Sequence, residues 1–279
     1  MLWRGREGSG NVEDGRGGGG GKALFGGGIG AAVLGLIVYL LGGDPSKVIN
    51  PGSDSASPTE TTAPANDSAK EFVSVVLRET EKVWETVFQE KYHESYQAPK
   101  LRLFTGTVQS GCGGASRSAG PFYCPLDQKV YIDLSFYDEL QNRFNAPGDF
   151  AMAYVVAHEV GHHVQNLLGI SEKVQRQRQQ SSEAESNALS VRLELQADFL
   201  AGVWAHYAQN MEGIIEPGDI QEAMGAAAAV GDDRLQQEGQ GYVVPDAFTH
   251  GSSAQRMYWF KKGYQSGNID DGDTFSADL

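Results

Sequence analysis

The chain has 279 residues, which is enough for one or two domains with a substantial packed core. Its 22 Lys and Arg stand against 36 Asp and Glu, so the net charge is −14. This balance argues against nucleic acid as a partner, because phosphate binding requires a basic surface. With only two cysteines, the chain also cannot form a four-cysteine metal site.

The first 43 residues divide into two segments. Residues 1–22 are rich in glycine and carry basic side chains, a composition that predicts disorder. Residues 23–43 are predicted to be a transmembrane anchor, since Ala23–Leu41 contains no charged residue and would span roughly 28 Å as a helix. A buried core helix and a cleaved signal peptide are the alternatives. The length of the run and the absence of an A-x-A cleavage pattern favour an uncleaved anchor.

The distribution of charge predicts the orientation of this anchor. Four basic residues precede the apolar run and only Lys47 follows it closely, so the N-terminus is expected in the cytoplasm. Residues 44–69 are rich in Pro, Ser and Thr and predict a flexible linker. The sequence therefore predicts a single-pass membrane protein whose folded domain lies outside the cytoplasm.

Residues 70–265 are predicted to form a mainly helical α+β domain with a small sheet, followed by a loose acidic tail at 266–279. Apolar residues at helical spacing begin the domain, and alternating apolar residues indicate two strands. Helices are expected near 69–96, 135–144, 148–168, 182–210, 217–237 and 252–265, and strands at 101–104 and 129–134.

Cys112 and Cys124 lie twelve positions apart in a stretch rich in Gly, Ser and Pro. In an oxidising compartment a disulfide between them would fix an otherwise flexible loop, whereas in the cytosol two free thiols would be expected. The predicted location outside the cytoplasm favours the disulfide.

The strongest chemical signal is His158-Glu159-Val160-Gly161-His162 within a long apolar helix. Histidines four residues apart leave one face of a helix about one turn from each other, which allows both to bind one zinc ion. Glu159 is placed to act as the base towards a metal-activated water. Burying these groups in an apolar helix without partners would cost several kcal/mol, and a metal ion resolves that cost.

A catalytic zinc site needs a third protein ligand. The helix RLELQADFLAGVWAH offers Glu194 and, one turn later, Asp198, both among apolar neighbours. We interpret Glu194 as the third ligand and Asp198 as the acceptor that orients a ligand histidine, His158 in preference. The alternatives are a solvated acidic face, or ligation by His163, His206 or Asp198 itself.

Four stretches together resemble the neutral zinc metallopeptidase family of bacterial membrane-anchored proteins, and the Glu-x-x-x-Asp pattern after HExxH resembles gluzincins. The stretches are GCGGASRSAGPFYCPLDQKVYIDLSFYDEL, AYVVAHEVGHHVQNLLGI, RLELQADFLAGVWAH and THGSSAQRMYWFKKGY. The resemblance implies a zincin-like fold, a zinc cofactor and peptidase activity. It also implies that His250 steadies the oxyanion of the reaction, although a histidine before a helix capped by Ser252 or Ser253 is the alternative. It further suggests that strand 129–134 borders the cleft and pairs with an extended peptide.

These observations predict a zinc-dependent metallopeptidase that acts on protein or peptide substrates outside the cytoplasm. Two alternatives stay open. The first is a binding protein stabilised by its metal and without catalysis, and the second is a zinc amidase that acts on cell-wall peptides.

Overall fold

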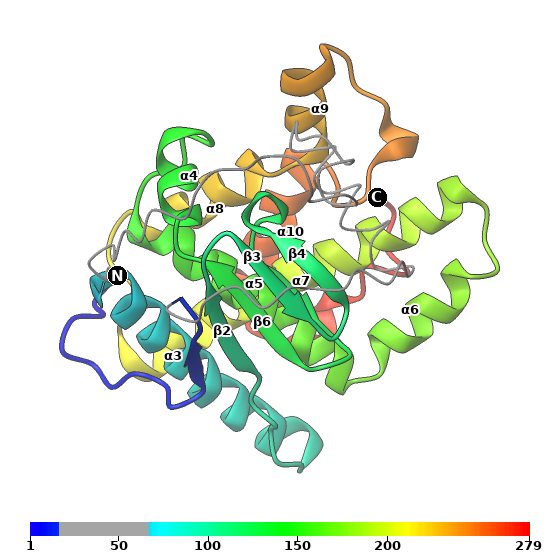
Figure 1. The fold of residues 1–279 in the computed structure, drawn as a ribbon. Helices are drawn as coiled ribbons and strands as arrows, with labels where there is room; N and C mark the ends of the chain where they lie inside the picture. The colour runs from blue at the N-terminus through cyan, green and yellow to red at the C-terminus, as the bar shows by residue number, and fades with distance from the viewer. Residues whose placement is uncertain (17–66) are drawn as a thin grey trace.

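A computed structural model describes residues 1–16 and 67–279 of the protein (Figure 1). The helices are α3 (Asp67–Tyr92), α4 (Phe136–Asn142), α5 (Asp149–Leu167), α6 (Ile170–Arg178), α7 (Glu183–Glu212), α8 (Asp219–Ala229), α9 (Asp232–Gln240) and α10 (Ser253–Ser266). Short 3-10 helices are η1 (Arg117–Ala119), η2 (Pro245–Ala247) and η3 (Ile269–Gly272). The strands are β1 (Val12–Asp14), β2 (Lys100–Phe104), β3 (Thr107–Ser110), β4 (Gly113–Ser116), β5 (Phe122–Cys124) and β6 (Lys129–Asp133). The predicted mainly helical α+β class is confirmed.

The main sheet has the strand order β1-β2-β6-β5, in which β5 alone runs antiparallel to its neighbour. Strand β6 therefore lies between β2 and β5, and β5 already occupies the position beside Lys129–Tyr131 where the sequence predicted that a peptide would pair. The edge strand on this side is β5, where an added peptide strand could still pair. The sequence did not reveal β5 because it has only three residues between turns.

The glycine-rich region before β5 is more ordered than its composition suggests. Strands β3 and β4 form an antiparallel hairpin there, and Cys112 is bonded to Cys124. The predicted disulfide is thus confirmed in the structure. It ties the end of the hairpin to the end of β5, so the bridge fixes the edge strand of the main sheet.

Helices α5, α7 and α10 form the centre of the domain. The main sheet lies against α5 (Figure 1). Helix α5 is buried along nearly its whole length, as its continuous apolar sequence predicted. The interior combines one face of α3 with β2, β6, α5, α7 and α10, and its largest fully buried side chains include Trp84, Trp204, Tyr154 and Phe150.

Glycines allow α7 to approach both of its neighbours closely. A Cβ atom on Gly161 of α5 would lie 3.0 Å from the carbonyl oxygen of Ala197, and one on Gly202 of α7 would lie 2.1 Å from that of Phe260. Such contacts require the absence of a side chain. The close packing brings the polar face of α7 to both α5 and α10, and this contact positions the candidate site.

The ends of the chain contradict two predictions. Residues 1–16, expected to be disordered, pack on the domain, and β1 pairs with β2. The acidic tail, expected to be loose, lies against α7, where buried Thr274 donates a hydrogen bond to the carbonyl oxygen of Arg192 over 2.6 Å. Composition did not predict the order of these two segments. In each, the contacts of a few large or polar side chains stabilise the segment against the domain despite the abundant glycine or aspartate.

Two further predictions met different outcomes. The single helix expected at 217–237 is divided into α8 and α9 at Val230 and Gly231. The predicted anchor at 23–43 lies outside the described residues, as does nearly all of the linker at 44–69. Within the ranges 1–16 and 67–279, no helix is long and apolar enough to cross a membrane.

The packing of the N-terminal segment leads to a stability prediction. Replacing Trp3 with Phe should lower the free energy of unfolding by about 1–2 kcal/mol, because the indole N–H donates to the Asp149 carboxylate over 3.0 Å and a phenyl ring cannot. Urea denaturation measures this difference. The control is Leu2→Ala, since Leu2 is exposed and its change should cost much less. Equal stability of Trp3→Phe and the unaltered protein would contradict the packing.

Candidate metal centre

Helix α5 carries the HExxH residues on a face that is almost fully enclosed. His158 and Glu159 are buried, and His162 is partly buried. Helical geometry places the two imidazoles one turn apart, with their ring centroids separated by 4.8 Å. The predicted arrangement of both rings on one face is therefore present.

Glu194 of α7 meets both histidines. Its Oε2 lies 3.2 Å from Nε2 of His158, and its Oε1 lies 3.4 Å from Nε2 of His162. Ligands held 2.0–2.1 Å from a tetrahedral zinc ion lie roughly 3.3 Å from one another. Each histidine nitrogen is therefore separated from one Glu194 oxygen by about the distance that a shared zinc ion would impose, and one ligand atom from each of the three residues lies within 4.8 Å of the other two.

The other ring nitrogen of each histidine has its own partner. Nδ1 of His158 lies 2.8 Å from Asp198, and Nδ1 of His162 lies 2.8 Å from Oε1 of Gln165. A carboxylate and an amide oxygen can only accept, so each Nδ1 is the donor. In a neutral ring this leaves the lone pair of Nε2 directed to Glu194, as a metal ligand requires.

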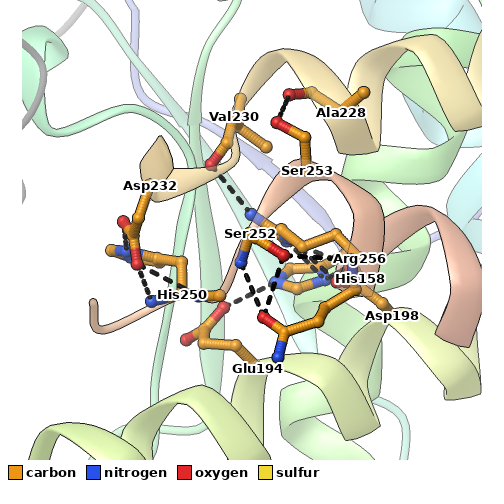
Figure 2. Close-up of polar contacts among 12 residues, drawn as sticks. His158, Glu194, Asp198, Ala228, Val230, Asp232, His250, Ser252, Ser253 and Arg256 are labelled. Carbon is orange, nitrogen blue, oxygen red and sulfur yellow. Dashed lines mark hydrogen bonds and ion pairs between the residues drawn. The ribbon is translucent and has the colours of Figure 1, made fainter. Parts of the chain in front are cut away.

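Asp198 is the centre of a buried network that joins three helices (Figure 2). Arg256 of α10 donates to both of its oxygens, from Nε over 2.8 Å and from Nη2 over 3.0 Å. The hydroxyl of Tyr154 donates to the same carboxylate that accepts from His158. The arginine therefore fixes the acceptor that in turn fixes His158.

The electrostatics of the cluster favour a positive charge between the histidines and Glu194. Burial opposes ionisation, but His162 and His158 outweigh it and hold the pKa of the Glu194 carboxyl well below its usual range. Burial would lower the pKa of His158, yet Asp198 and Glu194 raise it to about 10. A bound cation would satisfy the same demand for positive charge that a proton satisfies in its absence.

Glu159 differs from Glu194 in its ionisation. Burial raises the pKa of the Glu159 carboxyl, although His158 and His162 oppose this effect. A carboxylate with a raised pKa is a stronger base, and catalytic bases work best when their pKa is near the working pH. The environments of Glu159 and Glu194 thus shift the pKa values of these two carboxyl groups in opposite directions.

His250 lies at the edge of the same site, next to Asp232, in Figure 2. Nδ1 of His250 is 3.2 Å from Oδ1 of fully buried Asp232. Oδ2 of Asp232 accepts from the backbone N–H groups of Thr249, His250 and Gly251 over 2.6–3.0 Å. Burial lowers the pKa of His250, but Asp232 outweighs it and the net shift is upward. Ser252 caps α10, so the helix-entry position and a role in the site are compatible.

The rival ligands have other partners. His163 contacts the Tyr123 hydroxyl and the carbonyl oxygen of Gln97, while His206 contacts the carbonyl oxygen of Tyr264. The described residues include a second acidic group, Asp149, Asp219 and Glu222. The Met1 amino group lies within 3.1 Å of both aspartates and supplies positive charge there.

Sequence reasoning missed four residues of the site. Gln165, Tyr154 and Asp232 received no role, and Arg256 appeared only within the stretch THGSSAQRMYWFKKGY. The apolar setting of Gln165 and Tyr154 on α5 was the available signal, since buried polar groups need partners. Asp232 and Arg256 reach the site through tertiary packing, and neither has a local motif.

The fold and site define a class of protein in which a buried helix carries HExxH and the next long helix presents a glutamate to both histidines. The chain belongs to the family described as "Putative neutral zinc metallopeptidase", whose model matches residues 1–275.

The family resemblance seen in the sequence is thereby confirmed, and zinc is the metal that the family's description implies. The chain is 49% identical to an uncharacterised protein of Escherichia coli, YpfJ, over the full length of both. It is 44% identical to uncharacterised proteins of Mycobacterium bovis and Mycobacterium tuberculosis, over 85% of each chain. No solved structure matches the chain.

Proposed function

We propose that the protein is a zinc-dependent peptidase in which His158, His162 and Glu194 hold the metal. The observation that supports this most strongly is the spacing of the ligand groups, with Oε2 of Glu194 3.2 Å from Nε2 of His158 and Oε1 3.4 Å from Nε2 of His162. The helix arrangement that produces it is the one expected of a zincin-like domain. The donor set of two imidazoles and one carboxylate is a common set for catalytic zinc and leaves a position open.

Each nearby residue has a role in peptide hydrolysis. Zinc bound there would activate water and polarise a carbonyl group. Glu159 would accept the proton at its carboxylate and pass it to the leaving amine, because its raised pKa suits both transfers. His250, held by Asp232, would donate a hydrogen bond to the developing oxyanion.

The disulfide supports a location outside the cytoplasm, since such bonds persist in oxidising compartments. The two alternatives to a peptidase use the same cluster differently. A binding protein would have no need for Glu159 beside its ligands, so this residue favours an enzyme. An amidase would share the chemistry, and only its substrate separates it from a peptidase.

Zinc content and casein cleavage, measured on purified protein that has not been exposed to a chelator, test the proposal. We expect about one zinc ion per chain and cleavage of casein that stops after chelation and returns with zinc. Peptidoglycan fragments are assayed in parallel. Cleavage of these fragments alone would replace the peptidase by the amidase. Protein without stoichiometric metal, or with chelator-resistant cleavage, would overturn the assignment.

The contact between Asp232 and His250 predicts a change in pH dependence. Asp232→Asn should move the alkaline limb of the kcat profile about one pH unit lower, because the carboxylate that raises the pKa of His250 is lost. Above that pKa the imidazole is neutral, and because its remaining proton lies on Nδ1 towards residue 232, Nε2 has no proton to donate to the oxyanion. Thr249→Val is the control, since it removes a neutral hydroxyl 3.0 Å from the same nitrogen. An unmoved limb in Asp232→Asn would contradict the role given to His250.

A further inference from the structure

The N-terminal segment, residues 1–16, is bound to the domain by buried apolar contacts. Met1 and Trp3 are both less than 10% exposed. The Trp3 ring meets the Phe72 ring edge-on at 5.3 Å, and its N–H reaches Asp149 at the start of α5. The segment therefore contacts both α3 and α5, helices that form the core.

Buried carboxylates of α3, which also pair with Arg78 and Lys82 of the same helix, receive further partners from this segment. Glu81 is 4% exposed, and its Oε1 accepts from the Ser9 hydroxyl over 2.5 Å and from the Asn11 amide over 2.8 Å. Glu79 is fully buried and pairs with Arg6 over 3.3 Å. Removing the segment would take away some of the hydrogen-bond and charge partners of these buried carboxylates, at a cost in stability.

The segment also completes the main sheet. Strand β1 pairs in parallel with β2, and the hydrogen bonds from Leu101 N to Asn11 O and from Gly15 N to Leu103 O extend the pairing at both ends. Without β1, the buried strand β2 would become an open edge. Residues 1–16 are thus a structural part of the domain.

The described residues on either side of the gap at 17–66 lie close to each other. Asp14, at the end of β1, forms an ion pair with Lys70 in the first turn of α3 over 3.1 Å. The hydrocarbon core of a bilayer is about 30 Å thick. A single crossing between residues 16 and 67 would place these partners on opposite sides of it.

We propose that residues 1–16 and 67–279 lie on the same side of the membrane, so the apolar run at 23–41 is not a single-pass anchor between them. This replaces the predicted topology, in which the N-terminus and the domain were separated.

The basic residues that suggested a cytoplasmic N-terminus have another explanation. Arg6 pairs with Glu79 and Glu212, and Arg16 pairs with Asp14. The guanidinium of Arg4 lies over the Trp3 ring at 5.0 Å. Because these three arginines make contacts within the folded domain, they are not evidence for a cytoplasmic N-terminus. Since the disulfide favours an oxidising compartment, the N-terminal segment is expected there as well.

Thiol labelling of the full chain in spheroplasts tests the topology. Glu7→Cys and Glu94→Cys place single exposed cysteines in the N-terminal segment and in the domain. We expect a membrane-impermeant maleimide to label both equally before permeabilisation. Labelling of Glu94→Cys alone would overturn the proposal. If neither cysteine is labelled before permeabilisation, both segments still lie on one side of the membrane, but that side is the cytoplasm. None of these outcomes depends on peptidase activity.

A disulfide trap tests the packing in the membrane-resident protein. A Cβ at Gly8 would lie 3.3 Å from Cβ of Ser74, close to the 3.5–4.5 Å of a disulfide. With a protease site inserted between residues 17 and 66, the oxidised double variant Gly8→Cys, Ser74→Cys should keep its two fragments joined on a non-reducing gel. Gly10→Cys with Ser74→Cys is the control, because a Cβ at Gly10 has no neighbour within 4 Å. Separated fragments in the first variant would overturn the proposal.

Discussion

Replacing Glu159 with Gln should lower the rate of peptide hydrolysis by about 10²–10⁴-fold and leave the bound zinc in place. Gln has nearly the same shape as Glu but cannot accept a proton. The metal should stay because the proposed ligands, His158, His162 and Glu194, are unchanged, and their own contacts do not involve Glu159. Steady-state kinetics on casein and metal analysis of the same samples measure the two effects.

The combination of the two measurements separates the candidate functions. Retained zinc with lost hydrolysis supports an enzyme that uses Glu159 as its base. Unchanged hydrolysis would exclude this mechanism. Glu172→Gln is the matched control, because it makes the same chemical change at an exposed position on α6 and should leave both zinc and hydrolysis unaffected.

The central helices and the proposed ligands could be predicted because their signals are local. The spacing of His158 and His162 determines their relative direction once α5 is a helix, and the spacing of Glu194 and Asp198 does the same on α7. Chemistry then links the two helices, since zinc needs a third ligand. The donor distances agree with that reasoning although no contact between α5 and α7 could be read directly from the sequence.

The N-terminal segment could not be predicted because its fold depends on distant partners. Its glycines and arginines have the composition of a disordered chain, and Trp3 alone indicates little. Only the structure shows that Trp3 meets Asp149 and Phe72, 146 and 69 positions away. The prediction of a single-pass anchor has a separate basis, the apolar run at 23–41, and stays a prediction because that run lies outside the described residues.

Within the site, the role of Arg256 could not be predicted from the sequence for the same reason. Its position one turn into α10 gives no sign that it reaches Asp198, which lies 58 positions earlier. The contact depends on glycines at the crossing of α7 and α10, where a Cβ at Gly263 would lie 2.0 Å from the carbonyl oxygen of Phe199. Close helix packing is a property of the tertiary structure, so neither helix sequence predicts the pair.

Replacing Arg256 with Met should lower the free energy of unfolding of the zinc-free protein by about 3–5 kcal/mol. Arg256 and Asp198 are both almost completely buried, and Met would remove the guanidinium that donates to both oxygens of the Asp198 carboxylate. Because Asp198 also accepts from Nδ1 of His158, zinc affinity should fall by about 10–100-fold. Urea denaturation and metal competition titration measure the two effects.

A second change tests whether the cost comes from the charge pair or from lost packing. In an Asp198→Asn background, Arg256→Met should cost clearly less than in the unaltered protein, because the carboxylate that it would leave unpaired is already neutral. An equal cost in both backgrounds would contradict the ion pair as the cause. Arg256→Lys should restore part of the stability and less of the zinc affinity. An ammonium group supplies the charge, but it cannot reproduce the two parallel hydrogen bonds that fix the orientation of Asp198.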